Sequence, residues 1–261
     1  MKFLKRTLTG IIILLLSIFC VSKGGIYLLI MNLFLSTVAI YELENVINKD
    51  YSNNINININ NLIINVLFNV SFNLSVYFKK ELFAIALLCS FSLIELTLYT
   101  IFDKPIKEVL NNYFMHIYIT ITFSLMYFIS GTEYIWLIYI CSWGTDTAAY
   151  CTGMLFGRHK LTKISPKKTI EGAIGGIIGS MIIGAIFSIF YGNLNIAKIV
   201  IIAFFGSIIS QIGDISASKI KRKANVKDFG NIFIGHGGVM DRFDSFIFVL
   251  PYLSVLYCLG I

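Results

Sequence analysis

The chain has 261 residues, of which 57% are hydrophobic and 13% are charged, with a formal net charge of +7. Its mean hydropathy is +0.80. This composition lacks the polar surface that a soluble globular protein of this length requires, so we expect a polytopic membrane protein. Topology signals and attraction to anionic lipid headgroups explain the positive charge, whereas nucleic-acid binding would need a solvated basic domain.

Apolar runs long enough to cross a bilayer as helices recur along the chain. The first, MKFLKRTLTGIIILLLSIFC, begins like a signal peptide, but no small-residue cleavage pattern follows, and we interpret it as an uncleaved span. We predict an all-α, polytopic transmembrane helical bundle of about nine spans, with a polar cavity open to the cytosolic face. The predicted spans lie near residues 8–22, 25–41, 62–78, 81–99, 113–130, 134–151, 171–191, 194–212 and 244–260.

The distribution of basic residues orients these spans. If Met1 is cytosolic, the two most basic loops, Arg158 to Lys168 and Lys219 to Arg242, lie on the cytosolic side. We therefore expect an integral protein of a bacterial-type cell (inner) membrane whose active site faces the cytosol. The basic residues left on the outer side are Lys23, Lys79, Lys80 and Lys198.

The two halves of the chain differ in composition. We predict N-terminal transmembrane helices over residues 1–140 and a C-terminal transmembrane catalytic region over residues 141–261. The alternation of Asn and Ile in residues 51–66 is interpreted as compositional bias at a loop-to-helix entry. Small residues at four-residue spacing open the seventh predicted span and favour close helix packing over ligand contact: Gly172, Gly175, Gly176 and Gly179.

Carboxylates gather near the predicted cytosolic face. Asp214 follows the eighth predicted span, and Asp241 and Asp244, three residues apart, precede the ninth. Ionised groups at this depth usually face one another, water or an ion, and neighbouring carboxylates repel unless a cation lies between them. Because oxygen ligands suit Mg²⁺, we predict a magnesium site at these three aspartates. The alternative is solvated charge at helix ends, where Asp favours the N-terminus.

Glycines and cations around these carboxylates predict phosphate handling. The stretch KDFGNIFIGHGGVMDRFDS, residues 227–245, has glycines whose backbone N–H groups can form an anion-binding nest. The loop GRHKLTKISPKKTIEG, residues 157–172, offers Ser165 and Lys168 to phosphate oxygens, although it also resembles an ordinary helix entry. No GxxxxGK[ST] motif is present, so a P-loop nucleotide site is not supported.

Three blocks of residues share the spacing of one known family. One block contains Asp146, Ala149, Tyr150, Gly153 and Gly157 followed by SPKKTIEG, and another is Gly213-Asp214. The longest contains Ser218, Lys221, Arg222, Lys227, Asp228, Gly230, Gly235, His236, Gly237, Gly238, Asp241, Arg242 and Asp244. Together they resemble phosphatidate cytidylyltransferases, also called CDP-diacylglycerol synthases. The match spans roughly residues 141–245, and the chain departs from the family pattern at Ala148, Ile170, Asn225 and Ile234.

The resemblance implies that CTP and phosphatidate give CDP-diacylglycerol and pyrophosphate at the membrane, with Mg²⁺ and a second, monovalent cation such as K⁺. As catalytic residues we predict Asp214, Asp241, Asp244, Lys227 and Arg242, the three aspartates as metal ligands. For His236 a structural hydrogen bond is an equal alternative to substrate contact. The predicted substrate-binding residues are Ser165, Lys168, Ser218, Lys221, Arg222, His236, Gly237, Gly238 and Asp146.

Two other classes of function stay open from the sequence. A related CTP-dependent enzyme acting on another lipid, such as a polyprenol kinase or a CDP-archaeol-type synthase, would need similar residues. A membrane transporter would place charges near mid-bilayer and show internal repeats, which we do not find. Glu95, inside an early span, is the feature that best supports transport, and its alternative is a contact with the catalytic half. The sequence leaves the oligomeric state open, with a homodimer as one alternative.

Overall fold

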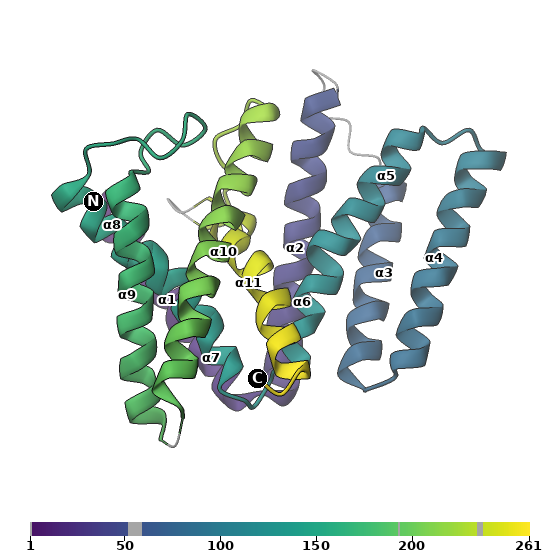
Figure 1. The fold of residues 1–261 in the computed structure, drawn as a ribbon. Helices are drawn as coiled ribbons and strands as arrows, with labels where there is room; N and C mark the ends of the chain where they lie inside the picture. The colour runs from purple at the N-terminus through teal and green to yellow at the C-terminus, as the bar shows by residue number, and fades with distance from the viewer. Residues whose placement is uncertain (1, 52–58, 193, 234–236) are drawn as a thin grey trace. The chain divides into compact units, whose positions relative to one another are not determined.

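The computed structural model describes residues 2–51, 59–192, 194–233 and 237–261, which are helical with connecting loops and contain no strand longer than an isolated bridge. Figure 1 labels the helices of the chain, which divides into two compact units. Unit 1 comprises Met1–Gly131 and Ala224–Arg242, and unit 2 comprises Thr132–Lys223 and Phe243–Ile261. The predicted all-helical class is thus confirmed, whereas the functional division at residue 140 stays a prediction.

Unit 1 is built from four long helices followed by a broken helical run. The long helices are α1 (Lys2–Lys23), α2 (Gly25–Tyr51), α3 (Ile59–Tyr77) and α4 (Glu81–Ile101). The run consists of α5 (Ile106–Met115), a π-helical segment (His116–Ile121), α6 (Thr122–Ser124) and a 3₁₀ turn (Leu125–Tyr127).

Unit 2 contains the remaining helices. A second broken run comprises α7 (Tyr134–Tyr139), a π-helical segment (Ile140–Gly144) and α8 (Thr145–Phe156). The long helices are α9 (Ile170–Tyr191), α10 (Ile196–Lys223) and α11 (Met240–Cys258), the last beginning in unit 1. Every predicted span overlaps one of these helices or helical runs.

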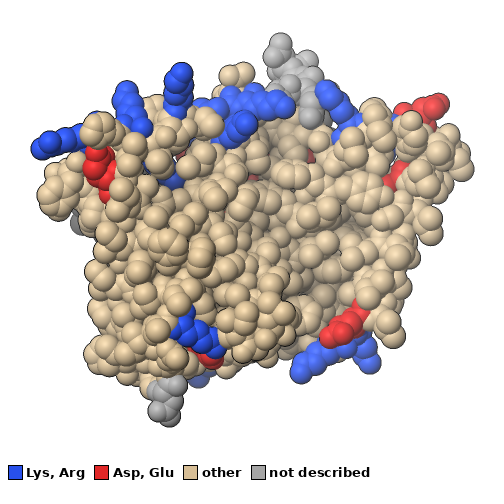
Figure 2. All heavy atoms as spheres, viewed as in Figure 1, with Lys and Arg blue, Asp and Glu red and all other residues tan. Residues whose placement is uncertain are grey.

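Within the described residues, five helices are long and apolar enough to cross a membrane: α2, α3, α4, α9 and α10. On the face drawn in Figure 2, charged side chains form small groups separated by broad areas of other residues. Helix α9 shows the pattern in detail, since Ile174, Ile178 and Ile182 are each more than half exposed on one side. A large exposed apolar surface is expected where lipid replaces water. The chain is therefore an integral membrane protein with several spans.

The opposite side of α9 packs against α8. A Cβ atom added at Gly175 would overlap Thr152, and one at Gly179 would overlap the methyl group of Ala148. At Gly176 such an atom would lie 3.0 Å from the Thr145 carbonyl oxygen. The predicted role of these glycines in close helix packing is thus confirmed.

Helix α10 is longer than the sequence suggested. The eighth predicted span ends near residue 212, whereas α10 continues to Lys223 and places Asp214 inside the helix. Its last turns contain Ala, Lys and Arg, which favour helix after the apolar run has ended. The chain then turns at Asn225, whose φ of 54° lies in the left-handed region that asparagine tolerates better than most residues.

The asparagines of α3 form a buried polar stripe in unit 1. Asn61, Asn65, Asn69 and Asn73 recur every four residues, and all are buried. Asn61 and Asn65 donate to the amide oxygen of Asn112 at 3.1 Å each, so the interpretation as compositional bias is wrong for these two; residues 52–58 lie outside the described residues. The stripe also contacts Asn32, Ser36, Thr37 and His116.

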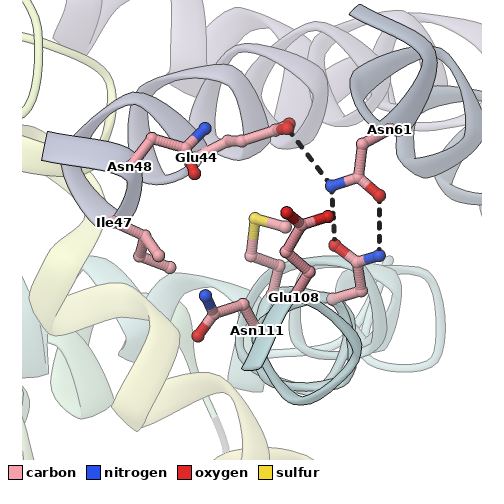
Figure 3. A pocket seen from close by; sticks show the side chains of 8 residues that line it. Glu44, Ile47, Asn48, Asn61, Glu108 and Asn111 are labelled. Atoms are coloured by element: carbon pink, nitrogen blue, oxygen red, sulfur yellow. Dashed lines mark hydrogen bonds between the residues drawn. The ribbon is translucent and has the colours of Figure 1, made fainter. Parts of the chain in front are cut away.

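One end of this stripe borders a small cavity of about 60 Å³. In Figure 3 the amide of Asn61 lies beside the carboxylate of Glu44, to which its nitrogen donates at 3.3 Å. The cavity is lined by Glu44, Ile47, Asn48, Asn61, Glu108, Asn111, Asn112 and Met115.

The buried carboxylate of Glu95 also finds its ion-pair and hydrogen-bond partners within unit 1. Its carboxylate is fully buried, accepts from the Lys104 ammonium at 2.8 Å and accepts from the Asn112 amide at 2.9 Å. The open alternative, a contact with the catalytic half, is therefore replaced by a local ion pair. This ion pair removes the main sequence feature that favoured a transporter.

Packing between α8 and α9 predicts a sharp difference between two substitutions. Gly175→Val should lower the free energy of unfolding in detergent by about 1–3 kcal/mol, because the added side chain overlaps Thr152. The matched control on the same helix, Ile178→Val, changes a half-exposed side chain and should shift stability by less than about 0.5 kcal/mol. Equal stability of the two variants would contradict the packing.

The buried ion pair of unit 1 predicts non-additive energetics. Lys104→Met should cost about 3–5 kcal/mol of unfolding free energy, because Glu95 is left as an uncompensated buried charge. The double variant Lys104→Met/Glu95→Gln removes both charges and should recover much of that loss. The four proteins of this double-mutant cycle are compared by equilibrium unfolding in mixed micelles. A double variant no more stable than Lys104→Met alone would refute the pairing.

Candidate active site

One face of α10 presents three of the predicted site residues. Asp214, Ser218 and Lys221 follow at intervals of four and three residues, which places them on the same side of a helix. The Ser218 hydroxyl donates to Oδ1 of Asp214 at 3.4 Å. Ser218 and Lys221 are buried, although polar side chains are usually exposed. Burial of a lysine requires a nearby negative partner.

Asp244 of α11 supplies negative charge to this cluster. At Gly213 an added Cβ atom would lie 2.9 Å from the Phe248 ring and 3.1 Å from the Asp244 carbonyl oxygen, so glycine permits close approach of α10 and α11. Asp244 is only 6% exposed and interacts electrostatically with Asp214 and Lys221, and also with Asp146. Three carboxylates and a buried lysine are thus close enough to influence one another.

Asp146 reaches the cluster from the first turn of α8. It lies two residues after the π-helical segment Ile140–Gly144, and such segments are frequent at functional sites. Within that segment, Trp143 packs against Phe243 and Phe246 of α11, with ring centroids 5.9 and 5.2 Å apart. These aromatic contacts hold the start of α8 beside the helix that contains Asp244.

The loop between α8 and α9 adds a cation. Lys168 forms an ion pair with Asp214 in which both side chains are about one quarter exposed, at 26% and 24%. The loop is ordered by a backbone bond from Leu161 N–H to the Lys168 carbonyl at 2.9 Å, and by Thr169, whose hydroxyl caps α9 by accepting from Gly172 N–H at 3.1 Å. The interpretation of this stretch as a helix entry is therefore confirmed.

The glycine-rich segment before α11 belongs to unit 1. Oδ2 of Asp241 accepts from the backbone N–H groups of Phe229 at 2.8 Å and Gly238 at 2.9 Å. Gly237 has a φ of 82°, which favours glycine, and its carbonyl accepts from Phe233 N–H at 2.9 Å. The Gly238 N–H is therefore engaged with Asp241 inside the loop.

Sequence reasoning missed Glu42 of α2. Its carboxylate is 1% exposed and accepts from the backbone N–H groups of Val239 and Met240 at the start of α11. The only signal in the sequence is an acidic residue directly after the second predicted span. The sequence gives no pointer to a partner 197 residues away.

The predicted site residues therefore fall into separate groups. Unit 2 brings together Asp146, Lys168, Asp214, Ser218, Lys221 and Asp244, and also contains Ser165, whose carbonyl accepts from Lys168 N–H, and exposed Arg222. Unit 1 contains Lys227, Gly237, Gly238, Asp241 and Arg242. Gly235 and His236 lie outside the described residues.

Metal binding can be judged by the donor set. In the part of the chain that the structure describes, no group of three or more His, Cys, Asp or Glu side chains has the arrangement of a metal site. Asp244 nevertheless lies among the like charges of Asp214 and Asp146, and carboxylates in this situation are stabilised by a cation. Carboxylate oxygens are the ligand type that Mg²⁺ prefers, so the chemistry of these donors is compatible with the ion predicted at Asp214, Asp241 and Asp244, whose binding stays a prediction.

Comparison with known proteins identifies the family. Residues 4–259 match the cytidylyltransferase family. Proteins named phosphatidate cytidylyltransferase from Staphylococcus saprophyticus and Staphylococcus epidermidis are each 36% identical to this chain over 258 residues. Another, from Staphylococcus haemolyticus, is 36% identical over 260 residues. Each alignment covers 96% of this chain and 97% of the relative. The resemblance predicted for roughly residues 141–245 is confirmed and extends over nearly the whole length, and the chain belongs to the cytidylyltransferase family.

Proposed function

We propose that this protein transfers CMP from CTP to phosphatidate, giving CDP-diacylglycerol and pyrophosphate. The observation that carries the proposal is the cluster of buried Asp244 and Lys221 with partly exposed Asp214 and Lys168, in a member of the cytidylyltransferase family. A cluster of both charges in an integral membrane protein suits a lipid substrate that has a phosphate headgroup. The relatives are phosphatidate cytidylyltransferases by name, and this supplies the substrate class.

The reaction needs alignment and charge neutralisation more than covalent help from the protein. An oxygen of the phosphatidate phosphate forms a bond to the α-phosphorus of CTP, and the bond from that phosphorus to the bridging oxygen breaks. Pyrophosphate leaves with the electron pair. The attacking phosphate is already ionised near neutral pH, so no side chain has to remove a proton.

We assign Mg²⁺ to Asp214, Asp241 and Asp244; when bound, the ion neutralises negative charge on the phosphate oxygens. Lys168 now neutralises Asp214, and because that pair is partly exposed, its ammonium can turn to a substrate phosphate when a cation occupies the carboxylate. A monovalent cation such as K⁺ is a further candidate. For phosphate and headgroup contacts we assign Ser165, Ser218, Lys221, Arg222, Lys227, Arg242, His236, Gly237 and Gly238, with Asp146 lining the cavity.

The membrane arrangement completes the proposal. All nine predicted runs cross the bilayer, in a bacterial-type inner membrane, and the basic loops place the polar cavity at the cytosolic face. CTP is then met on the side where it is made, while phosphatidate enters from the adjacent leaflet. A homodimer is compatible with this arrangement.

The substrate assignment predicts the products of a defined assay. Purified protein in lipid nanodiscs, given CTP, Mg²⁺ and phosphatidate, should release one pyrophosphate for each lipid-linked CMP formed. Release of CDP with a phosphorylated polyprenol would instead indicate a kinase. Turnover only with an archaeal-type ether lipid phosphate would show that this lipid, and not phosphatidate, is the substrate. Accumulation of solute in sealed vesicles without these products would indicate transport.

The carboxylate assignment predicts a selective loss of turnover. Asp214→Asn and Asp244→Asn should each lower kcat by on the order of 10²-fold or more, because each removes charge that would hold the cation. Membrane insertion and detergent extraction should stay normal. Glu81→Gln, an exposed carboxylate at the start of α4, is the control and should keep full activity. Near-normal kcat in both aspartate variants would remove the metal assignment.

A further inference from the structure

Glu42 connects α2 to the glycine-rich motif, residues 227–245, which contains Asp241 and Asp244. Its Oε1 accepts from Val239 N–H at 3.0 Å and its Oε2 accepts from Met240 N–H at 2.9 Å. The first N–H groups of a helix have no partner within the helix, and negative charge near them is favourable. Capping side chains usually come from the adjoining residues, whereas this carboxylate comes from α2. It satisfies the first turn of α11 from a distant part of the chain.

Two glycines of the motif make room for this carboxylate. A Cβ atom added at either Gly230 or Gly238 would overlap Oε1 of Glu42. Neither glycine has a positive φ, so backbone conformation does not demand glycine at these positions. A larger residue would push the carboxylate away from Val239 and Met240. The glycines therefore serve the contact with Glu42, a need that a phosphate nest does not explain.

A second carboxylate fixes the same loop. Oδ2 of Asp241 accepts from Phe229 and Gly238 N–H groups, as described above. Glu42 and Asp241 together accept four backbone hydrogen bonds from the segment between Phe229 and Met240. Their charges repel one another, and a buried carboxylate without these bonds would be costly. Each carboxylate is therefore held in place by the loop that it orders.

We propose that Glu42 is a positioning residue for CMP transfer, an inference that rests on the proposed function. Its hydrogen bonds to Val239 and Met240 fix the position of the first turn of α11, and Asp241 lies in that turn. Asp241 directly follows Met240, which donates to Glu42, so a shift of this first turn displaces Asp241. Small misplacements of reacting groups can lower rates by on the order of 10²-fold.

The test compares two buried glutamates of α2. Glu42→Gln keeps the size of the side chain but removes its charge and turns an amide donor toward a backbone N–H. We expect a tenfold to hundredfold lower kcat with little change in KM for CTP. Amide hydrogen exchange in peptides covering residues 229–240 should become faster in the full-length protein. Glu44→Gln is the matched control, because Glu44 is also buried but lines the separate cavity of unit 1, and it should leave both readouts unchanged.

A second variant covers the case in which Glu42→Gln does not fold. Gly230→Ala keeps the charge but displaces the carboxylate, and it should produce the same faster exchange and lower kcat. Wild-type kcat in a variant with faster exchange would overturn the positioning role. Equal losses in the Glu42 and Glu44 variants would also overturn it, because they would indicate general destabilisation. Hydrogen exchange needs no substrate, so failure of the wild-type protein to form CDP-diacylglycerol would refute the proposed function separately.

Discussion

A carboxylate buried among apolar helices needs a partner, and this constraint organises both units of the structure. The free energy cost of an unpaired buried charge is several kcal/mol, so each such group dictates what must lie beside it. Glu95 pairs with the Lys104 ammonium, Glu42 accepts hydrogen bonds from the N–H groups at the start of α11, and the partly buried Asp214 pairs with Lys168. In each case the partner lies on another helix or loop, so the pairs fix tertiary structure as well as local charge.

Glycine residues allow the helices of unit 2 to approach closely enough for their charged side chains to interact. Close approach of α10 and α11 at Gly213 brings Asp214 and Asp244 into one electrostatic cluster, and the small face of α9 allows α8, with Asp146 in its first turn, to pack tightly. In a membrane there is little hydrophobic force between helices, so backbone contact at small residues replaces it. The same feature that stabilises the bundle therefore also concentrates charge at the candidate active site.

The sequence predicted what depends on local pattern. Apolar runs located the helices, four-residue spacing identified the packing face of α9, and the motif identified the family. Local pattern failed where side chains meet across the chain. Asn61 and Asn65 look like biased composition until Asn112 is placed beside them, and nothing near Glu42 indicates that its partners are Val239 and Met240. The end of α10 was missed because an apolar run ends before the helix does.

The three aspartates of the proposed metal site have different surroundings, which bears on how the site works. Asp214 and Asp244 have basic neighbours in Lys168 and Lys221, so their charge is already offset by side chains that can turn to phosphate. Asp241 has its Oδ2 committed to two backbone N–H groups, which tie it to the glycine-rich loop. Any ligand bound by Asp241 would therefore be coupled to the conformation of that loop, whereas ligands of the other two would compete with ammonium groups. The proposed metal ligands are thus of two kinds: Asp214 and Asp244 have lysine neighbours that can turn to substrate phosphates, whereas Asp241 orders the backbone. Glu42, which lies outside residues 227–245, orders the backbone of the same segment.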